Sequence, residues 1–411
     1  MVEALQELNP APRLLMGPGP INADPRVLRA MSAPLLGQFD PQFREYMSQT
    51  AELFRRVFQT ANHATLVVDG TARSGIEAAL VSLIEPGDRV LVPVFGRFGH
   101  LKVEIAKRCG AQVRAIETDW GSVFPDEVLE KEIRKYKPNL VAVSHGDTST
   151  TMAQPLAGLG RLCREHDALL YVDATATLGG VDLPADAWQL DVVSAGLQKC
   201  LGGPSGAAPL TLNARAAQRI FRRRHTEQGL RTSDAVDGEG SAIRSNYLDL
   251  AMIADYWSEK ALNHHTEATS MLYAARECAR ILVKEGLANA FARHARASDA
   301  VTAGLRAMGL ALFGDQKHKM ANITGVFVPP GVDGEKVRRA LLSHFAVEIG
   351  TSFGPLHGKI WRIGAMGYNA RADAVLATLG ALEAVLAGEG FKIQRGAAVD
   401  AALAVFRHRA D

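Results

Sequence analysis

The residues best suited to chemistry are an aspartate and a lysine that each follow a short apolar segment. Asp173 ends the segment 169–173, and Lys199 lies between the segment 191–194 and a glycine-rich turn. Short apolar segments bounded by helix-length sequence predict buried strands, and open α/β sheets bind ligands beyond the carboxyl ends of their strands. The two residues are 26 positions apart (199 − 173). We therefore expect an amine and a carboxylate at one edge of the same sheet.

This pair predicts a particular cofactor. A lysine with apolar neighbours has a lowered pKa and can form a Schiff base with an aldehyde. An aspartate can hold the protonated nitrogen of a pyridine ring, and pyridoxal phosphate (PLP) requires both groups. Taken singly, Asp173 could be a helix cap and Lys199 an exposed loop residue. Together they favour a PLP site.

A phosphate site is predicted where residues 68–75 (VDGTARSG) pass from a strand through a turn into a helix. The free N–H groups of a helix start, with the Thr71 hydroxyl and the Arg73 guanidinium, would bind an anion. The segment does not contain the P-loop pattern GxxxxGK[ST]. A capped helix start without a ligand would explain the same residues.

The elements that must position these residues alternate between apolar strands and amphipathic helices, which is typical of a mostly parallel sheet covered on both faces. The predicted fold class is α/β: a large domain with such a sheet and a smaller C-terminal α/β domain. Four divisions of the chain are expected, namely an N-terminal arm, the large domain, the small domain and a tail (1–22, 23–275, 276–395 and 396–411).

Length and composition exclude several classes of protein. With 411 residues, 47% of them hydrophobic and 22% charged, the chain predicts an ordered globular protein. A formal net charge of +2 provides no global attraction to nucleic acid or to a membrane surface. Four widely spaced cysteines predict a reduced, cytoplasmic protein without a metal site. The N-terminus predicts no signal peptide. We expect the arginines at 222–224 to lie on a solvated helix face.

Several ordered motifs, from LLMGPGPINADPRVLRAM to WRIGAMGYNARADAV, cover most of the chain. They resemble the class V aminotransferases of PLP fold type I, in the alanine–glyoxylate group, and most closely the (S)-ureidoglycine–glyoxylate aminotransferases of purine catabolism. The resemblance implies ping-pong transamination of (S)-ureidoglycine with glyoxylate, which gives oxalurate and glycine. Alanine–glyoxylate or serine–pyruvate transamination is the alternative within the family.

The resemblance also implies roles for the residues of the cofactor site. Lys199 in LQK would bind PLP covalently and act as the catalytic base, and Asp173 in YVDATA would pair with the ring nitrogen. Phe98 would stack on the ring, where the family commonly has tryptophan. The remaining contacts would go to the phosphate, from Thr71, Ala72, Arg73 and Gln198, and to the ring hydroxyl, from Thr148. The family often has Ser-Gly-His where this chain has Thr-Ala-Arg.

Substrate and partner contacts follow from the same resemblance. Arg362 in WRIGAMG would bind the substrate carboxylate as a bidentate fork. Thr266 in LNHHTEA would reach the cofactor phosphate of a neighbouring subunit, which implies a homodimer with shared active sites.

Two carboxamides are the candidates for selecting the substrate. Gln38 and Asn263 stand where alanine-specific relatives usually have a small residue and a tyrosine. Carboxamides match the carbonyl and N–H groups of a ureido group, whereas the methyl group of alanine offers no such partner. Both could instead be ordinary interface residues. The adjacent His264 and His265 are expected to pack at the interface, without a catalytic role.

Three other functions remain to be weighed against transamination. Cysteine desulfurases need a mobile cysteine, and the small domain has none in a glycine- or serine-rich loop. A ligand-sensing module without catalysis is compatible with the fold, but the chain keeps every residue that the chemistry needs. A nicotinamide enzyme would carry GxGxxG after its first strand, which is missing here.

Overall fold

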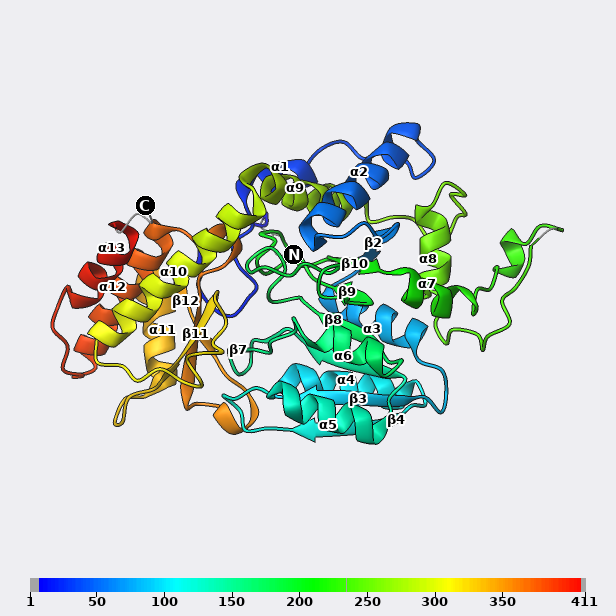
Figure 1. Ribbon diagram of the computed structural model, residues 1–411. Helices are drawn as coiled ribbons and strands as arrows, with labels where there is room; N and C mark the ends of the chain where they lie inside the picture. Colours follow the sequence, from blue (N-terminus) through cyan, green and yellow to red (C-terminus); the bar gives the residue numbers. More distant parts are fainter. Residues whose placement is uncertain (1–6, 234, 408–411) are drawn as a thin grey trace, which may run out of the picture.

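The computed structural model describes residues 7–233 and 235–407, which form a large and a small unit (Figure 1). The large unit contains a seven-stranded sheet in the order β2-β10-β9-β8-β5-β3-β4. Strand β10 is antiparallel to both of its neighbours, and the other strands run parallel to one another. In sheet order the bounds are Ala64–Asp69, Ala207–Leu212, Val192–Ser194, Leu169–Asp173, Leu140–Ser144, Arg89–Val94 and Gln112–Glu117.

Helices cover both faces of this sheet and make two separate cores. One core includes residues of α2 and α9, such as Phe54 and Leu282. The other includes residues of α3 and α4, such as Leu80 and Ile105. This arrangement confirms the predicted α/β fold class. The helices of the large unit are α1 Pro25–Met31, α2 Pro41–Phe58, α3 Ala72–Leu83, α4 Arg97–Arg108, α5 Asp126–Tyr136, α6 Leu159–Glu165, α7 Ala214–Phe221, α8 Leu250–Trp257 and α9 Thr269–Glu285.

The small unit has its own sheet and core. Strands β11 (Ile323–Phe327), β14 (Ile360–Gly364) and β13 (Gly350–Thr351) pair antiparallel in that order. Trp361 is fully buried in the core beneath them. The covering helices are α10 Leu287–Ala307, α11 Gly334–Phe345, α12 Ala372–Gly388 and α13 Ala397–Arg407.

The chain crosses between the units twice. Helices α9 and α10 meet at Gly286, whose φ of 85° suits a residue without a side chain, and they run from the large unit to the small one (Figure 1). The predicted domain boundary at 275–276 falls inside α9. Near the N-terminus, β1 (Leu14–Leu15) pairs in parallel with β12 (Val347–Glu348) of the small unit. Within residues 7–233 and 235–407, no helix combines the length and apolar character of a membrane span.

The prediction of a solvated arginine face is wrong for Arg223, which is 2% exposed. Its guanidinium donates hydrogen bonds to the carbonyls of Ser82 (2.8 Å) and Ile84 (2.9 Å) and to that of Ser241 (2.7 Å). The last carbonyls of a helix lack partners within the helix, and a buried guanidinium can satisfy several of them at once. Arg223 thereby ties the segment that leaves α7, the extended green arm of Figure 1, to the end of α3.

Candidate active site

A cavity of about 320 Å³ lies at the carboxyl edge of the large sheet. The turns that follow β2, β8 and β9 contribute to its wall, as expected for the ligand site of an open α/β sheet. Eight of the predicted residues line it: Thr71, Ala72, Arg73, Phe98, Thr148, Asp173, Gln198 and Lys199. The structure therefore brings together residues that are up to 128 positions apart in the sequence (199 − 71).

Lys199 is buried in the turn after β9 and donates a hydrogen bond to the carbonyl of Pro18. Burial, followed by the positive charge of Arg362, lowers the pKa of the Lys199 amine to about 8. An amine with such a pKa is partly neutral, and so nucleophilic, near neutral pH. Gly19 closes the cavity over this amine: its φ is 102°, and a Cβ there would collide with the end of the Lys199 side chain. The lowered pKa agrees with the prediction from sequence.

Asp173 ends β8 and is 4% exposed. Its Oδ1 accepts the backbone N–H of Thr175 at 3.0 Å. Its Oδ2 accepts a hydrogen bond from the ammonium group of Lys102 at 2.9 Å, which makes an ion pair buried on both sides. The sequence analysis missed Lys102. Its signal is its place in α4, where Gly99, Lys102 and Ile105 share the buried face.

The position of Phe98 depends on a second residue that the sequence analysis missed. Asp147, in the short strand β6 (Gly146–Asp147), is fully buried. Its Oδ2 accepts the backbone N–H of Phe98 at 2.8 Å, and its Oδ1 accepts that of Ser149 at 2.9 Å. A carboxylate that accepts a backbone N–H of the first helical turn stabilises the helix start. Asp147 therefore fixes the beginning of α4, which carries Phe98.

The cavity residues fit PLP. Two buried side-chain oxygens on its wall, Oε1 of Gln198 and Oγ1 of Thr175, have no hydrogen-bond partner among the described residues. The start of α3 also faces the cavity, and the hydroxyl of Thr71 makes no capping hydrogen bond there. The first N–H groups of α3 therefore have no side-chain acceptor, and a phosphate would satisfy them. An amine, a carboxylate, an aromatic ring and an anion site are the groups that this cofactor needs.

Arg362 does not line the cavity but lies next to it. Its buried guanidinium donates to the carbonyl of Thr148 at 2.5 Å and to that of Thr351. Burial lowers its pKa to about 10, so the group remains a cation at neutral pH. It also lies 5.0 Å from the centre of the Phe353 ring. The structure thus places a fixed positive charge behind Thr148, close enough to lower the pKa of Lys199.

The remaining predicted residues, Gln38, Asn263 and Thr266, do not contribute to the cavity wall. Gln38 and Asn263 lie together, since Nε2 of Gln38 donates to Oδ1 of Asn263 at 3.0 Å. Oε1 of Gln38 is buried and finds no partner in the described part of the chain. Leu35 and Phe39, on either side of Gln38, are 69% and 77% exposed. We call Gln38 and Asn263 the carboxamide pair; it borders exposed apolar surface.

A buried cluster anchors the segment that carries Asn263 and Thr266. Asp69, at the end of β2, accepts the backbone N–H of Ala268 at 3.0 Å, and its Oδ2 lies 3.2 Å from Nε2 of His265. Nδ1 of His265 hydrogen-bonds Nδ1 of His264 at 2.7 Å. Burial and the neighbouring Asp69 raise the pKa of Glu267 well above its usual range. The ligand atoms of Asp69, His265 and Glu267 have a spacing that a cation could bridge; protonation of Glu267 would also relieve the repulsion between the two carboxylates.

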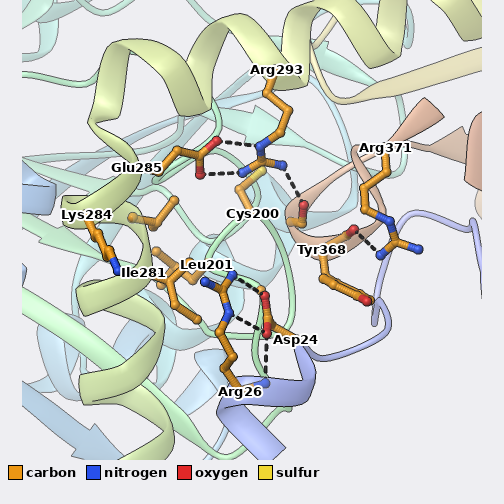
Figure 2. A pocket seen from close by; sticks show the side chains of 13 residues that line it. Asp24, Arg26, Cys200, Leu201, Ile281, Lys284, Glu285, Arg293, Tyr368 and Arg371 are labelled. Carbon is orange, nitrogen blue, oxygen red and sulfur yellow. Dashed lines mark hydrogen bonds and ion pairs between the residues drawn. The ribbon is translucent and has the colours of Figure 1, made fainter. Parts of the chain in front are cut away.

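A second cavity, of about 430 Å³, lies between the N-terminal segment, α9, α10 and the turn after β14. Figure 2 shows two ion pairs among its charged side chains: Arg26 with Asp24, and Arg293 with Glu285. Cys200, the neighbour of Lys199, lies at its wall. This cavity therefore borders the residues that follow Lys199, and its wall contains none of the predicted site residues.

Comparisons with known proteins identify the family of the chain. The sequence profile of the family described as aminotransferase class-V matches residues 30–359. The (S)-ureidoglycine–glyoxylate transaminase of Bacillus subtilis (strain 168) is 51% identical over 398 residues, which cover 96% of each chain. An alanine–glyoxylate aminotransferase of Drosophila melanogaster is 36% identical over 375 residues, 89% of this chain and 91% of its own.

Solved structures give the same picture. The crystal structure of ureidoglycine–glyoxylate aminotransferase from Bacillus subtilis superposes with a TM-score of 0.93 at 50% identity, covering 98% of this chain and all of the other. The pyridoxamine–pyruvate aminotransferase of Mesorhizobium loti superposes with a TM-score of 0.88 at 27% identity, covering 96% of this chain and 97% of its own.

Proposed function

The chain belongs to the class-V aminotransferases, whose cofactor is PLP, and on that premise we propose that it transfers the amino group of (S)-ureidoglycine to glyoxylate in purine catabolism. The products would be oxalurate and glycine. Two features support this donor: the 51% identity to a relative named for the reaction, and the hydrogen-bonded carboxamide pair. Alanine–glyoxylate transamination is the second candidate, because the relative of that name from Drosophila melanogaster is 36% identical, well below 51%.

We propose that eight cavity residues bind the cofactor. Lys199 would hold it covalently, Asp173 would pair with its ring nitrogen and Phe98 would stack on the ring. The other contacts would come from the start of α3 and from two further side chains, namely Thr71, Ala72, Arg73, Gln198 and Thr148. The free N–H groups at the start of α3, where Thr71 provides no side-chain cap, support the phosphate contacts.

In the proposed mechanism, protein groups bind the amino acid and move one proton. PLP, when bound, supplies an electron sink for the pair of electrons that a departing Cα proton leaves behind. The guanidinium of Arg362 binds the substrate carboxylate and so fixes the direction of the Cα–H bond. Once the substrate amine has displaced it from the cofactor, the amine of Lys199 would accept the Cα proton and hold it for its later return. Its lowered pKa suits both transfers at neutral pH.

Substrate choice rests on the carboxamide pair. A ureido group presents one carbonyl acceptor and several N–H donors. Gln38 and Asn263 already satisfy each other once, through Nε2 and Oδ1, while Oε1 of Gln38 is left without a donor. A ureido N–H would supply that donor. The methyl group of alanine would leave the buried oxygen unsatisfied, which is unfavourable.

We further propose that the carboxamide pair and Thr266 serve the active site of a second copy of the chain in a homodimer. None of these three residues contributes to the wall of the cavity in its own chain. The exposed side chains of Leu35 and Phe39 beside Gln38 provide apolar surface for such an interface.

We also propose a cytoplasmic location, because the four cysteines are free thiols.

A comparison of amino donors tests the proposed function. Purified protein loaded with PLP would be supplied with glyoxylate and with freshly prepared (S)-ureidoglycine, alanine or serine, and glycine formation would be measured. We expect (S)-ureidoglycine to give the largest kcat/KM, by at least tenfold. A larger kcat/KM for alanine would assign the chain to the second candidate function, and no glycine from any donor would refute transamination to glyoxylate.

A further inference from the structure

A fully buried lysine lies behind the cavity and belongs to none of the roles described so far. Lys102, on α4, has no exposed surface. Its ammonium group donates to Oδ2 of Asp173 at 2.9 Å, to the hydroxyl of Ser144 at 2.7 Å and to the carbonyl of Phe98 at 3.3 Å. All three of its N–H donors are thus directed at oxygen atoms, and one of them belongs to the carboxylate of the cavity.

Charge burial explains why this contact matters. A buried ammonium ion or carboxylate is costly alone and is tolerated when the two are paired and hydrogen-bonded. Without a ligand, the described partners of the Asp173 carboxylate are Lys102 and the N–H of Thr175. A carboxylate has about four acceptor positions, so Asp173 still has capacity for a further donor from the cavity side.

The same ammonium group connects two parts of the cavity wall. Phe98 lies one helical turn before Lys102 on α4, whereas Asp173 ends strand β8. The Lys102 side chain bridges the carbonyl of the first and the carboxylate of the second. A displacement of α4 relative to β8 would therefore break the ion pair. Lys102 thus holds the part of α4 that carries Phe98 at a fixed distance from the Asp173 carboxylate.

We propose that Lys102 is a positioning residue: it holds the Asp173 carboxylate ready for the cofactor's ring nitrogen and balances its charge while the site is empty. This inference rests on the proposed cofactor-binding role of Asp173. The ring nitrogen, as a cation, would share the carboxylate with Lys102. The cofactor and Lys102 are then partly interchangeable as partners of Asp173, so each stabilises the folded chain less in the presence of the other.

Melting temperatures of the empty and loaded enzyme test this coupling. Lys102→Met keeps most of the side-chain volume and removes the charge. We expect the empty variant to melt roughly 5 °C or more below the empty wild type. Because the ring nitrogen would replace the lost cation, adding PLP should raise the melting temperature of Lys102→Met by more than it raises that of the wild type. If Lys102 only supported the fold, Lys102→Met would lower the melting temperatures of the empty and the loaded enzyme by equal amounts.

The double variant Lys102→Met/Asp173→Asn serves as the control and guards against a poorly folding single variant. It removes both charges, so the empty protein should recover part of the stability lost in Lys102→Met, and its gain on adding PLP should be smaller than that of the wild type. Equal gains in wild type and Lys102→Met, or no recovery in the double variant, would overturn the inference. If PLP does not stabilise even the wild type, the proposed function fails instead.

Discussion

The cavity and the surroundings of the carboxamide pair differ in how completely the chain satisfies their buried carboxylates. At the cavity, the carboxylate of Asp173 and that of the neighbouring buried Asp147 each have at least two hydrogen bonds from the chain itself. Beside the carboxamide pair, Oε1 of Gln38 and both carboxylate oxygens of Glu267 are buried with no hydrogen-bond partner in the described part of the chain. The chain itself thus satisfies the carboxylates at the cavity, whereas the carboxylate of Glu267 beside the carboxamide pair is left without a donor among the described residues.

The difference follows from how the two regions are built. The cavity lies at the ends of strands β8 and β9, whose side chains are fixed by the sheet and by helices on both faces. The carboxamide pair joins two connecting segments, one before α2 and one before α9. Loops tolerate change and often determine specificity on a rigid scaffold. We infer that the scaffold sets the reaction type and the loops set the amino donor.

The largest effect is expected from Lys199→Ala, which removes the reactive amine from the cavity. Without the amine, no group can hold the cofactor covalently or accept the Cα proton. We expect turnover to fall by at least about 10⁴-fold and the visible absorbance of the lysine-bound cofactor to disappear. Lys319→Ala is a matched control, because burial also lowers the pKa of Lys319 to about 8 although it lies outside the cavity. Retained turnover in Lys199→Ala would contradict its proposed role.

A smaller effect is expected from Arg362→Gln, at the edge of the same region. The loss of a charged fork for the carboxylate should raise KM for every amino donor by about 100-fold, while the absorbance of the bound cofactor is unchanged. Arg338→Gln is the control, since this neighbouring arginine forms an ion pair with Glu335 instead. An unchanged KM in Arg362→Gln would remove the carboxylate-binding role.

Substitutions in the carboxamide pair should change kcat/KM for one donor relative to another without abolishing the reaction. We expect Gln38→Ala or Asn263→Ala to lower kcat/KM for (S)-ureidoglycine by about 30-fold and for alanine by less than about threefold. Because the two side chains hydrogen-bond each other, the double variant should lose little more than either single variant. Equal losses for both donors would show that the pair supports the fold and not the choice of donor.

The sequence predicted the parts of this molecule that depend on local pattern. The strands that end at Asp173 and precede Lys199 are continuous apolar runs, so their place in a sheet and the convergence of the two residues could be predicted. The antiparallel strand β10 was not predicted, because its sequence, AAPLTL, contains proline and two alanines and resembles a loop.

Contacts between distant segments could not be predicted from pattern. The ion pair of Lys102 and Asp173 joins a helix and a strand 71 positions apart, and a lysine in an amphipathic helix normally faces water. Asp147 has no apolar run of its own, since it lies in a two-residue strand. The partners of such buried charges are determined by the tertiary fold.

The smallest effect is expected for the buried cluster of Asp69, His265 and Glu267, which holds the segment that carries Thr266. Here the stability of the chain should depend on pH. Since burial and Asp69 raise the pKa of Glu267, the folded chain keeps a proton there that the unfolded chain releases. The stability that this proton provides is full below the ordinary glutamate pKa and declines as pH rises towards the raised value. Glu267→Gln replaces the neutral acid with a group that never ionises. Its melting temperature should therefore exceed that of the wild type by roughly 2 °C or more at pH 8 and by less at pH 5.

Asp69→Asn, which removes the neighbouring charge, should give the same trend. A difference that does not change with pH would mean that Glu267 is ionised in the folded chain and that a cation or a partner group balances it.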